Sequence, residues 1–166
     1  MTQEGYSKMA NHNKSKQAKS SARMAGVQFL YEAEINDGLI NPTTGGDFSQ
    51  QYWGHKSDDR PRPDKVALQS LIAGVSEDKV VLDEIIISAI DNNRSFGHID
   101  VLLKSILRAA TYELLRQPDV PMPVVIDEYV EVARAFYFEN EPAFVNGVLD
   151  NIGKVLRHPS NKIIQT

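Results

Sequence analysis

Apolar residues recur at helical spacing through most of the chain, and short polar stretches rich in Gly, Pro, Asn and Asp separate these segments. The first such segment predicts a helix that begins near Lys16–Ser21 and ends at Asn36, before Asp37 and Gly38. Two further helices are expected, from Asp64 to Gly74 and from Ser76 to Ile90, with Asp64 and Ser76 as N-caps.

The C-terminal part predicts three more helices. One follows the expected N-cap Asp100 and reaches Arg116, and the next begins near Pro121–Pro123. The last follows Asn140 as N-cap and reaches Leu156. No segment shows sustained strand alternation, so we predict an all-α fold with six to seven helices.

The chain divides into three parts by composition. Residues 1–15 are polar and aperiodic and are expected to form a disordered basic arm, residues 16–157 a single helical domain, and residues 158–166 a loose tail. The irregular stretch 37–63 is long for a loop. Part of it is expected to pack on the domain through Phe48, Tyr52 and Trp53.

Composition excludes several classes of protein. The 166 residues contain no Cys, which excludes disulfides, thiolate catalysis and Cys-ligated zinc. No apolar run approaches the roughly 20 residues of a membrane span, and the N-terminus does not resemble a secretory signal. These features fit a cytoplasmic protein.

The net charge of −4 is distributed unevenly. Residues 24–166 are acidic, whereas residues 1–23 contain only Glu4 against five cations, namely Lys8, Lys14, Lys16, Lys19 and Arg23. Of these cations, Lys14, Lys16, Lys19 and Arg23 run into the start of the first predicted helix, and each could neutralise a phosphate of a nucleic acid. The alternative is a solvated tail that only aids solubility.

Aromatic residues are concentrated where the last two helices meet. Phe136, Tyr137 and Phe138 are consecutive, and successive helical residues are rotated by about 100°, so at least one should be exposed or packed against the neighbouring loop. Phe136 and Phe144 could flank a surface that stacks RNA bases, or both could be core residues. Gly147 interrupts an apolar helix at a cost of about 1 kcal/mol, which suggests a close backbone approach.

Catalysis has little support in the sequence. The four histidines are far apart, and no P-loop or nucleophile elbow is present. Asp127, Glu128 and Glu131 could serve acid–base chemistry or bind a divalent ion. The alternative is that Asp127 and Glu128 interact with the dipole in the first helical turn and that Glu131 pairs with Arg134.

Several segments resemble the NusB family of transcription antitermination and ribosomal-RNA processing factors. They lie between Lys16 and Leu156 and read ARMAGVQFLYEAEI, SLIAGV, ILRAATYELL, DVPMPVVIDEYVEVAR and FVNGVLD. The resemblance implies two packed helical sub-bundles without catalysis, metal or cofactor. It also implies binding of boxA-type single-stranded RNA together with NusE, a small-subunit ribosomal protein, and loading of an antitermination complex on RNA polymerase.

The resemblance also implies roles for individual residues. The arginine-rich stretch of the family falls on Lys16–Arg23, although Ser20 and Ser21 stand where arginines are common. The RNA-contacting positions fall on Phe136, Asn140, Phe144, Asn146 and Gly147. The surface for NusE falls on Tyr31 and on the helix around Leu103 and Arg108.

Two other functions fit the same residues. One is a helical protein-interaction module with little intrinsic RNA binding, which the lysine-based arm favours because Lys lacks the bidentate fork of Arg. The other is the NusB-like domain fused to ribosomal-RNA cytosine methyltransferases, but this chain has no Cys nucleophile. A monomer and a homodimer are both compatible with the sequence.

Overall fold

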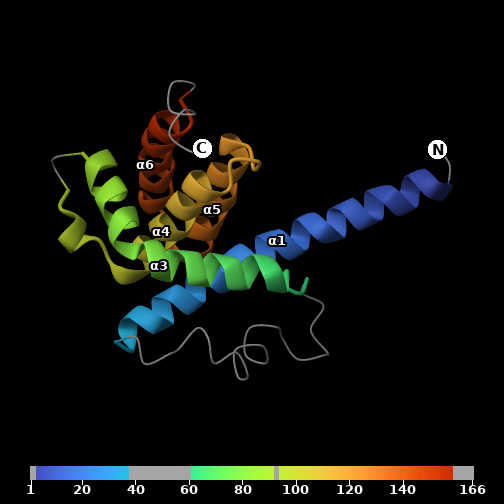
Figure 1. Ribbon diagram of the computed structural model, residues 1–166, viewed down its shortest axis with the longest axis horizontal. Helices are drawn as coiled ribbons and strands as arrows, with labels where there is room; N and C mark the ends of the chain where they lie inside the picture. Colours follow the sequence, from blue (N-terminus) through green and yellow to red (C-terminus); the bar gives the residue numbers. More distant parts are fainter. Residues whose placement is uncertain (1–2, 38–60, 92–93, 159–166) are drawn as a thin grey trace.

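The computed structural model describes residues 3–37, 61–91 and 94–158, and these residues contain helices but no strand (Figure 1). The predicted all-α fold is confirmed. The described part has five α-helices and one short 3-10 helix instead of six to seven helices. Their bounds are Gln3–Ile35 (α1), Lys65–Ala89 (α3), Phe96–His98 (η1), Val101–Arg116 (α4), Met122–Phe136 (α5) and Glu141–Leu156 (α6).

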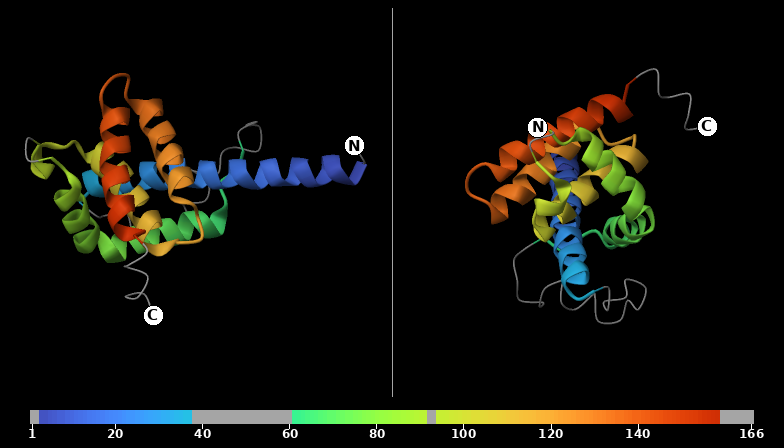
Figure 2. Two further views of the ribbon diagram at one scale, coloured as in Figure 1. Left: turned by 90° about the horizontal axis from the view of Figure 1, so that it is seen from above. Right: turned by 90° about the vertical axis from the view of Figure 1, so that its left-hand side faces the viewer.

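Helix α4 is the centre of the packing. It contacts α1, α3, α5 and α6, and the views in Figure 2 show it enclosed by the other helices. Its side chains from Leu103 to Leu114 are nearly all buried. Most buried apolar residues belong to one cluster that includes all five α-helices, and a small second cluster joins α1 to α3. All five α-helices therefore contribute to one main hydrophobic core.

One helix, α3, replaces the two that were predicted on either side of Gly74 and Ser76. Ser76 is not an N-cap, because its hydroxyl donates to the Ile72 carbonyl oxygen inside the helix, at 2.8 Å. Gly74 is tolerated within the helix because the Tyr112 ring packs directly on its backbone. A Cβ at this position would lie 2.1 Å from that ring.

Helix α1 begins at Gln3, well before the predicted start near Lys16–Ser21. The prediction of a disordered arm is therefore wrong for residues 3–15. Side chains from Ser7 to Gln17 are all exposed, and this half of α1 projects from the bundle (Figures 1 and 2). The segment lacks Pro, but it contains Gly5 and several Asn and Ser residues of low helix propensity. It is helical as an extension of the packed part of α1, which needs no new nucleation step.

Two of the predicted helix caps are confirmed. The Asp64 carboxylate accepts a hydrogen bond from the Ala67 backbone N–H, and the Asp100 carboxylate accepts one from the Leu103 backbone N–H. Asn140 occupies the N-cap position of α6, but its side chain makes no capping hydrogen bond. Its backbone has φ −88° and ψ −24°, which is helical and not the extended conformation of a usual N-cap.

The predictions for Phe48, Tyr52 and Trp53 lie outside the described residues, as does the tail from residue 159 onward. Among residues 3–37, 61–91 and 94–158, no helix is both long and apolar enough to cross a membrane.

Candidate nucleic-acid interface

The projecting half of α1 carries exposed lysines on one side. At 3.6 residues per turn, Lys8, Lys16 and Lys19 lie within about 80° of one another around the helix axis. Lys14 is exposed too, but it lies on the opposite side of the helix. Helix formation thus places two of the predicted phosphate-binding cations, Lys16 and Lys19, in a row with Lys8. We call these three residues the lysine row, and Lys14 is not part of it.

Arg23 continues the lysine row into the bundle, but it is not a surface cation. Its Nε donates to both carboxylate oxygens of Glu113, at 3.1 and 3.0 Å, and its Nη1 lies 3.3 Å from a Glu128 oxygen. Burial raises the pKa of the Glu113 carboxyl, and the Arg23 charge opposes that shift. The Arg23 guanidinium thus links α1 to α4 and α5, which argues against its predicted contact with a phosphate.

The three consecutive aromatic residues at the end of α5 have different surroundings. Phe136 is half-buried and packs against the core. The half-buried Tyr137 donates a hydrogen bond from its hydroxyl to Asp100, at 2.6 Å. Phe138 is 100% exposed, which confirms that at least one of the three faces solvent. The exposed ring is thus not the one that the family resemblance assigned to RNA.

Phe144 is half-buried on α6, and a cation covers its ring. The ring packs against the core, and the guanidinium carbon of Arg94 lies over it, 4.6 Å from the ring centroid. This distance is within the range of a cation–π contact. Arg94 lies between α3 and η1, far from Phe144 in the sequence, and no local pattern marks it as part of this site.

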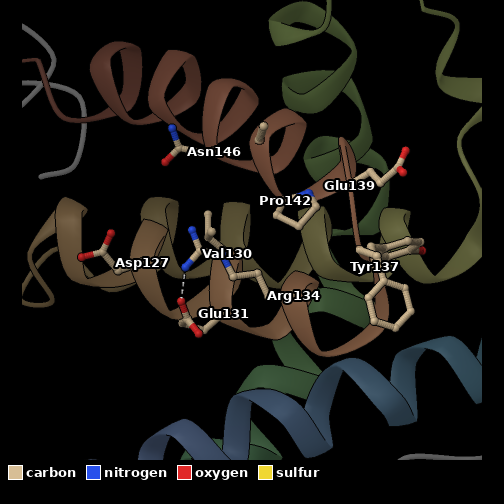
Figure 3. A pocket seen from close by; sticks show the side chains of 10 residues that line it. Asp127, Val130, Glu131, Arg134, Tyr137, Glu139, Pro142 and Asn146 are labelled. Carbon is tan, nitrogen blue, oxygen red and sulfur yellow. Dashed lines mark hydrogen bonds and ion pairs between the residues drawn. The ribbon is translucent and has the colours of Figure 1, made fainter.

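A groove of about 880 Å³ runs along α5 and α6 on the side that includes Phe138. Figure 3 shows Asp127 and Glu131 on the α5 wall and Asn146 on the α6 wall. Glu139 adds a third carboxylate, and the single arginine of the lining, Arg134, pairs with Glu131 as predicted. An acidic lining disfavours RNA phosphates, so Asn146 lies in an unfavourable place for the predicted contact.

The two remaining predicted RNA residues are exposed. Asn140 lies at the junction of α5 and α6, and Gly147 lies on the outer face of α6. The expected close backbone approach at Gly147 is wrong, because a Cβ there would meet no atom within 4 Å. Close approach occurs at Gly74 instead, where the Tyr112 ring occupies the space of a side chain.

Two of the three carboxylates considered for catalysis form ion pairs with arginines. Glu128 pairs with Arg23 and Glu131 with Arg134. Neither Asp127 nor Glu128 is in the first turn of α5, so the expected dipole interaction is wrong for both. Across the three described ranges, no group of three or more His, Asp or Glu side chains could hold a metal ion.

Comparisons with known proteins agree with this helical arrangement. The model of the NusB family matches residues 20–154. This chain belongs to the NusB family. The transcription antitermination protein NusB of Allorhizobium ampelinum is 37% identical to it over 147 residues, which cover 87% of this chain and 91% of that protein. The NusB of Rhizobium meliloti is 36% identical over the same shares.

A solved structure supports the NusB fold independently. Thermotoga maritima NusB superimposes with a TM-score of 0.70 at 28% identity, covering 88% of this chain and 96% of that chain. The match extends over most of both chains, so it concerns the whole bundle and not a single helix pair.

Two of the three residues assigned to the NusE surface of this NusB-family chain are buried. Leu103 packs in the core. Arg108 is held by Asp83 through two hydrogen bonds of 2.7 and 2.9 Å, and it also approaches Glu34 at 3.5 Å. Only Tyr31 is half-exposed. The side chains of Leu103 and Arg108 therefore offer little surface to a partner, and the partner surface on the helix around them stays a prediction.

The lysine row and the junction between α5 and α6 lie toward opposite ends of α4. Arg23 anchors the lysine row at Glu113, whereas Tyr137 anchors the junction at Asp100. The rise of an α-helix puts about 20 Å between these two attachment points. The lysine row and this junction are therefore two separate regions of the surface.

Proposed function

We propose that this chain is a non-enzymatic, RNA-binding transcription antitermination factor. It binds boxA-type single-stranded RNA together with NusE and helps to assemble the antitermination complex on RNA polymerase. Family membership over residues 20–154 carries the proposal, because the curated relatives are transcription antitermination proteins.

Electrostatics supports a role of α1 in RNA binding. The chain is acidic overall, yet Lys8, Lys16 and Lys19 form an exposed row on a helix that projects from the bundle. Each lysine that contacts a phosphate displaces a counterion, so the affinity falls with rising salt concentration. Lys14 faces the other side and should contribute less than Lys16 and Lys19.

The junction between α5 and α6 supplies the second contact. Asn140 and Gly147 are exposed there, and Phe144 lies beneath Arg94. Because about 20 Å of α4 separates this junction from the attachment of the lysine row, one RNA that contacts both must be extended over the surface. Extended single strands offer unstacked bases for such recognition.

NusE binding would involve the surface near Tyr31 on α1. Leu103 and Arg108 contribute indirectly, because the Arg108–Asp83 and Arg108–Glu34 ion pairs hold α4 against α3 and α1. A mutation of Arg108 should therefore weaken NusE binding only by disturbing the packing of these helices.

The test is a binding titration with boxA-like RNA and a scrambled control, each with and without NusE, over a series of salt concentrations. The expected result is preference for boxA, tighter binding with NusE, and a logarithmic salt slope that shrinks by about one unit for Lys16→Ala or Lys19→Ala. Lys154→Ala is the matched control, since this exposed lysine lies on α6 and pairs with Asp150. Equal affinity for both RNAs, unaffected by NusE, would contradict the proposal.

A protein-interaction module with little RNA binding is the second candidate. The acidic groove favours it, because three carboxylates and the fully exposed Phe138 lie where a phosphate would be repelled. Under this alternative, NusE binds with undiminished affinity in high salt, and RNA adds nothing to the complex. The titration described above separates the two candidates.

A further inference from the structure

The guanidinium of Arg94 has no carboxylate partner among the described residues, unlike most other arginines of the bundle. Arg23, Arg108, Arg116 and Arg134 are all paired with carboxylates, and Arg157 donates to backbone carbonyl oxygens. The described contacts of Arg94 are a backbone hydrogen bond to Asp91 and the aromatic contact with Phe144. Within residues 3–37, 61–91 and 94–158, no hydrogen bond from the Arg94 guanidinium competes with a ligand for its N–H donors.

The position of Arg94 also changes how Phe144 can act. The Phe144 ring packs against the core, and the Arg94 guanidinium lies over the ring. A base that approached this ring would meet Arg94 first. Phe144 by itself is therefore not an open stacking surface, and contact between it and a base would require displacement of Arg94.

We propose that Arg94, supported by Phe144, is the outer layer of a base-stacking platform for single-stranded RNA. This inference rests on the proposed RNA-binding function. A guanidinium is planar, and its faces stack on aromatic rings, so a base can pack on the side that faces away from Phe144. The N–H donors at its edge remain free for a phosphate or a base carbonyl.

The surface beside the guanidinium is hollowed and polar. A cavity of about 320 Å³ is lined by Arg94, Ser95, His98, Asp100 and Glu141 together with two apolar residues. Hydroxyl, imidazole and carboxylate groups can hydrogen-bond the edge of a base, whereas apolar atoms pack against its face. The two carboxylates in the lining favour the amino groups of a base over a phosphate at this place.

The test is to measure the affinity of Arg94→Ala and Arg94→Lys for boxA-like RNA. Arg94→Ala should weaken binding roughly tenfold, the size of one lost stacked base. Arg94→Lys keeps the charge but not the plane, so it should recover only part of the loss. Unchanged or tighter binding by Arg94→Ala would show that Arg94 is absent from the site or merely covers Phe144, and would overturn the inference. If Arg94→Lys bound the RNA with wild-type affinity, the charge alone would explain the contact, and the inference would also be overturned.

A double-mutant cycle tests the layered arrangement. Phe144→Leu keeps an apolar side chain but removes the aromatic face, so it should weaken binding in the same direction as Arg94→Ala. The double variant should lose little more than the worse single variant, because both remove one platform. Strictly additive losses would contradict the layering.

Two controls distinguish loss of the stacking platform from a change in net charge and from a loss of folding stability. Arg134→Ala removes an exposed arginine from the acidic groove, so it changes the net charge equally and should leave RNA affinity unchanged. Chemical denaturation should show that Arg94→Ala unfolds at nearly the wild-type midpoint. If the wild type shows no preference for boxA RNA, the proposed function itself fails. If the wild type prefers boxA RNA and Arg94→Ala binds it with the same affinity, only the base-stacking platform is refuted.

Discussion

The Nε atom of Arg23 lies 3.0 Å from a carboxylate oxygen of Glu113, and this ion pair joins α1 to α4 inside the bundle. Only 8% of the Arg23 side chain and 7% of the Glu113 side chain are exposed. The same guanidinium also reaches Glu128 on α5. Because these contacts fix the rotation of α1 about its axis, they also determine which way the lysine row faces.

Removal of either partner of the Arg23–Glu113 pair should destabilise the protein strongly. Arg23→Ala or Glu113→Ala leaves a buried charge without its main partner, and such changes cost about 3–5 kcal/mol. The measurement is the free energy of unfolding from urea denaturation. The matched control is Arg116→Ala, whose pair with Asp78 is more exposed and should cost less than about 1 kcal/mol. Similar losses for both variants would contradict the assigned role of Arg23.

Gly74→Ala and Gly147→Ala should have opposite effects on stability. A methyl group at Gly74 would overlap the Tyr112 ring, and overpacking of this kind costs about 1–3 kcal/mol. A methyl group at Gly147 meets nothing, so the better helix propensity of Ala should stabilise by up to about 1 kcal/mol. Thermal unfolding measures both. In a Tyr112→Ala background the Gly74→Ala penalty should largely disappear, and its persistence would point to another cause.

Phe136 and Phe138 should differ sharply on truncation although they are two residues apart. Phe136→Ala removes a ring that packs against the core and should cost at least about 2 kcal/mol. Phe138→Ala removes a fully exposed ring and should change stability by less than about 0.5 kcal/mol. Denaturant midpoints measure the difference. If Phe136→Ala instead lowers RNA affinity with little loss of stability, this residue is an RNA contact as the family resemblance implied.

Glu34 should make folding stability depend on acid pH. The hydrogen bond from Lys79, together with the weaker effect of the Arg108 charge, lowers the pKa of the Glu34 carboxyl below its ordinary value, although burial opposes the shift. The unfolded chain therefore binds this proton more readily, and the stabilisation is present above the ordinary pKa. It is lost as the pH falls through the lowered pKa. The acid limb of a stability-versus-pH profile should be flatter in Glu34→Gln, and identical limbs would exclude this contribution.

Local sequence patterns were enough to predict most of the helices. The caps at Asp64 and Asp100 and the extent of α4 follow from residues close together in the chain, because a helix forms hydrogen bonds over only four positions. The same locality explains two errors in the predicted helix bounds, namely the division of α3 into two helices and the late start of α1. Local breaker signals at Gly74 and Ser76 were overridden by Tyr112 of α4, and the polar start of α1 gave no periodicity from which to detect a helix.

The sequence by itself determined the helical class, the family and the number of cations near the N-terminus. Only the tertiary structure decided that Lys16 and Lys19 are exposed while Arg23 is buried, because the carboxylate of Glu113 that holds Arg23 lies 90 residues away. It likewise placed Arg94 over Phe144 and enclosed Leu103 and Arg108 in the bundle. Spacing along a chain specifies which face of a helix is apolar, but burial and ion pairing depend on which other helix packs against that face.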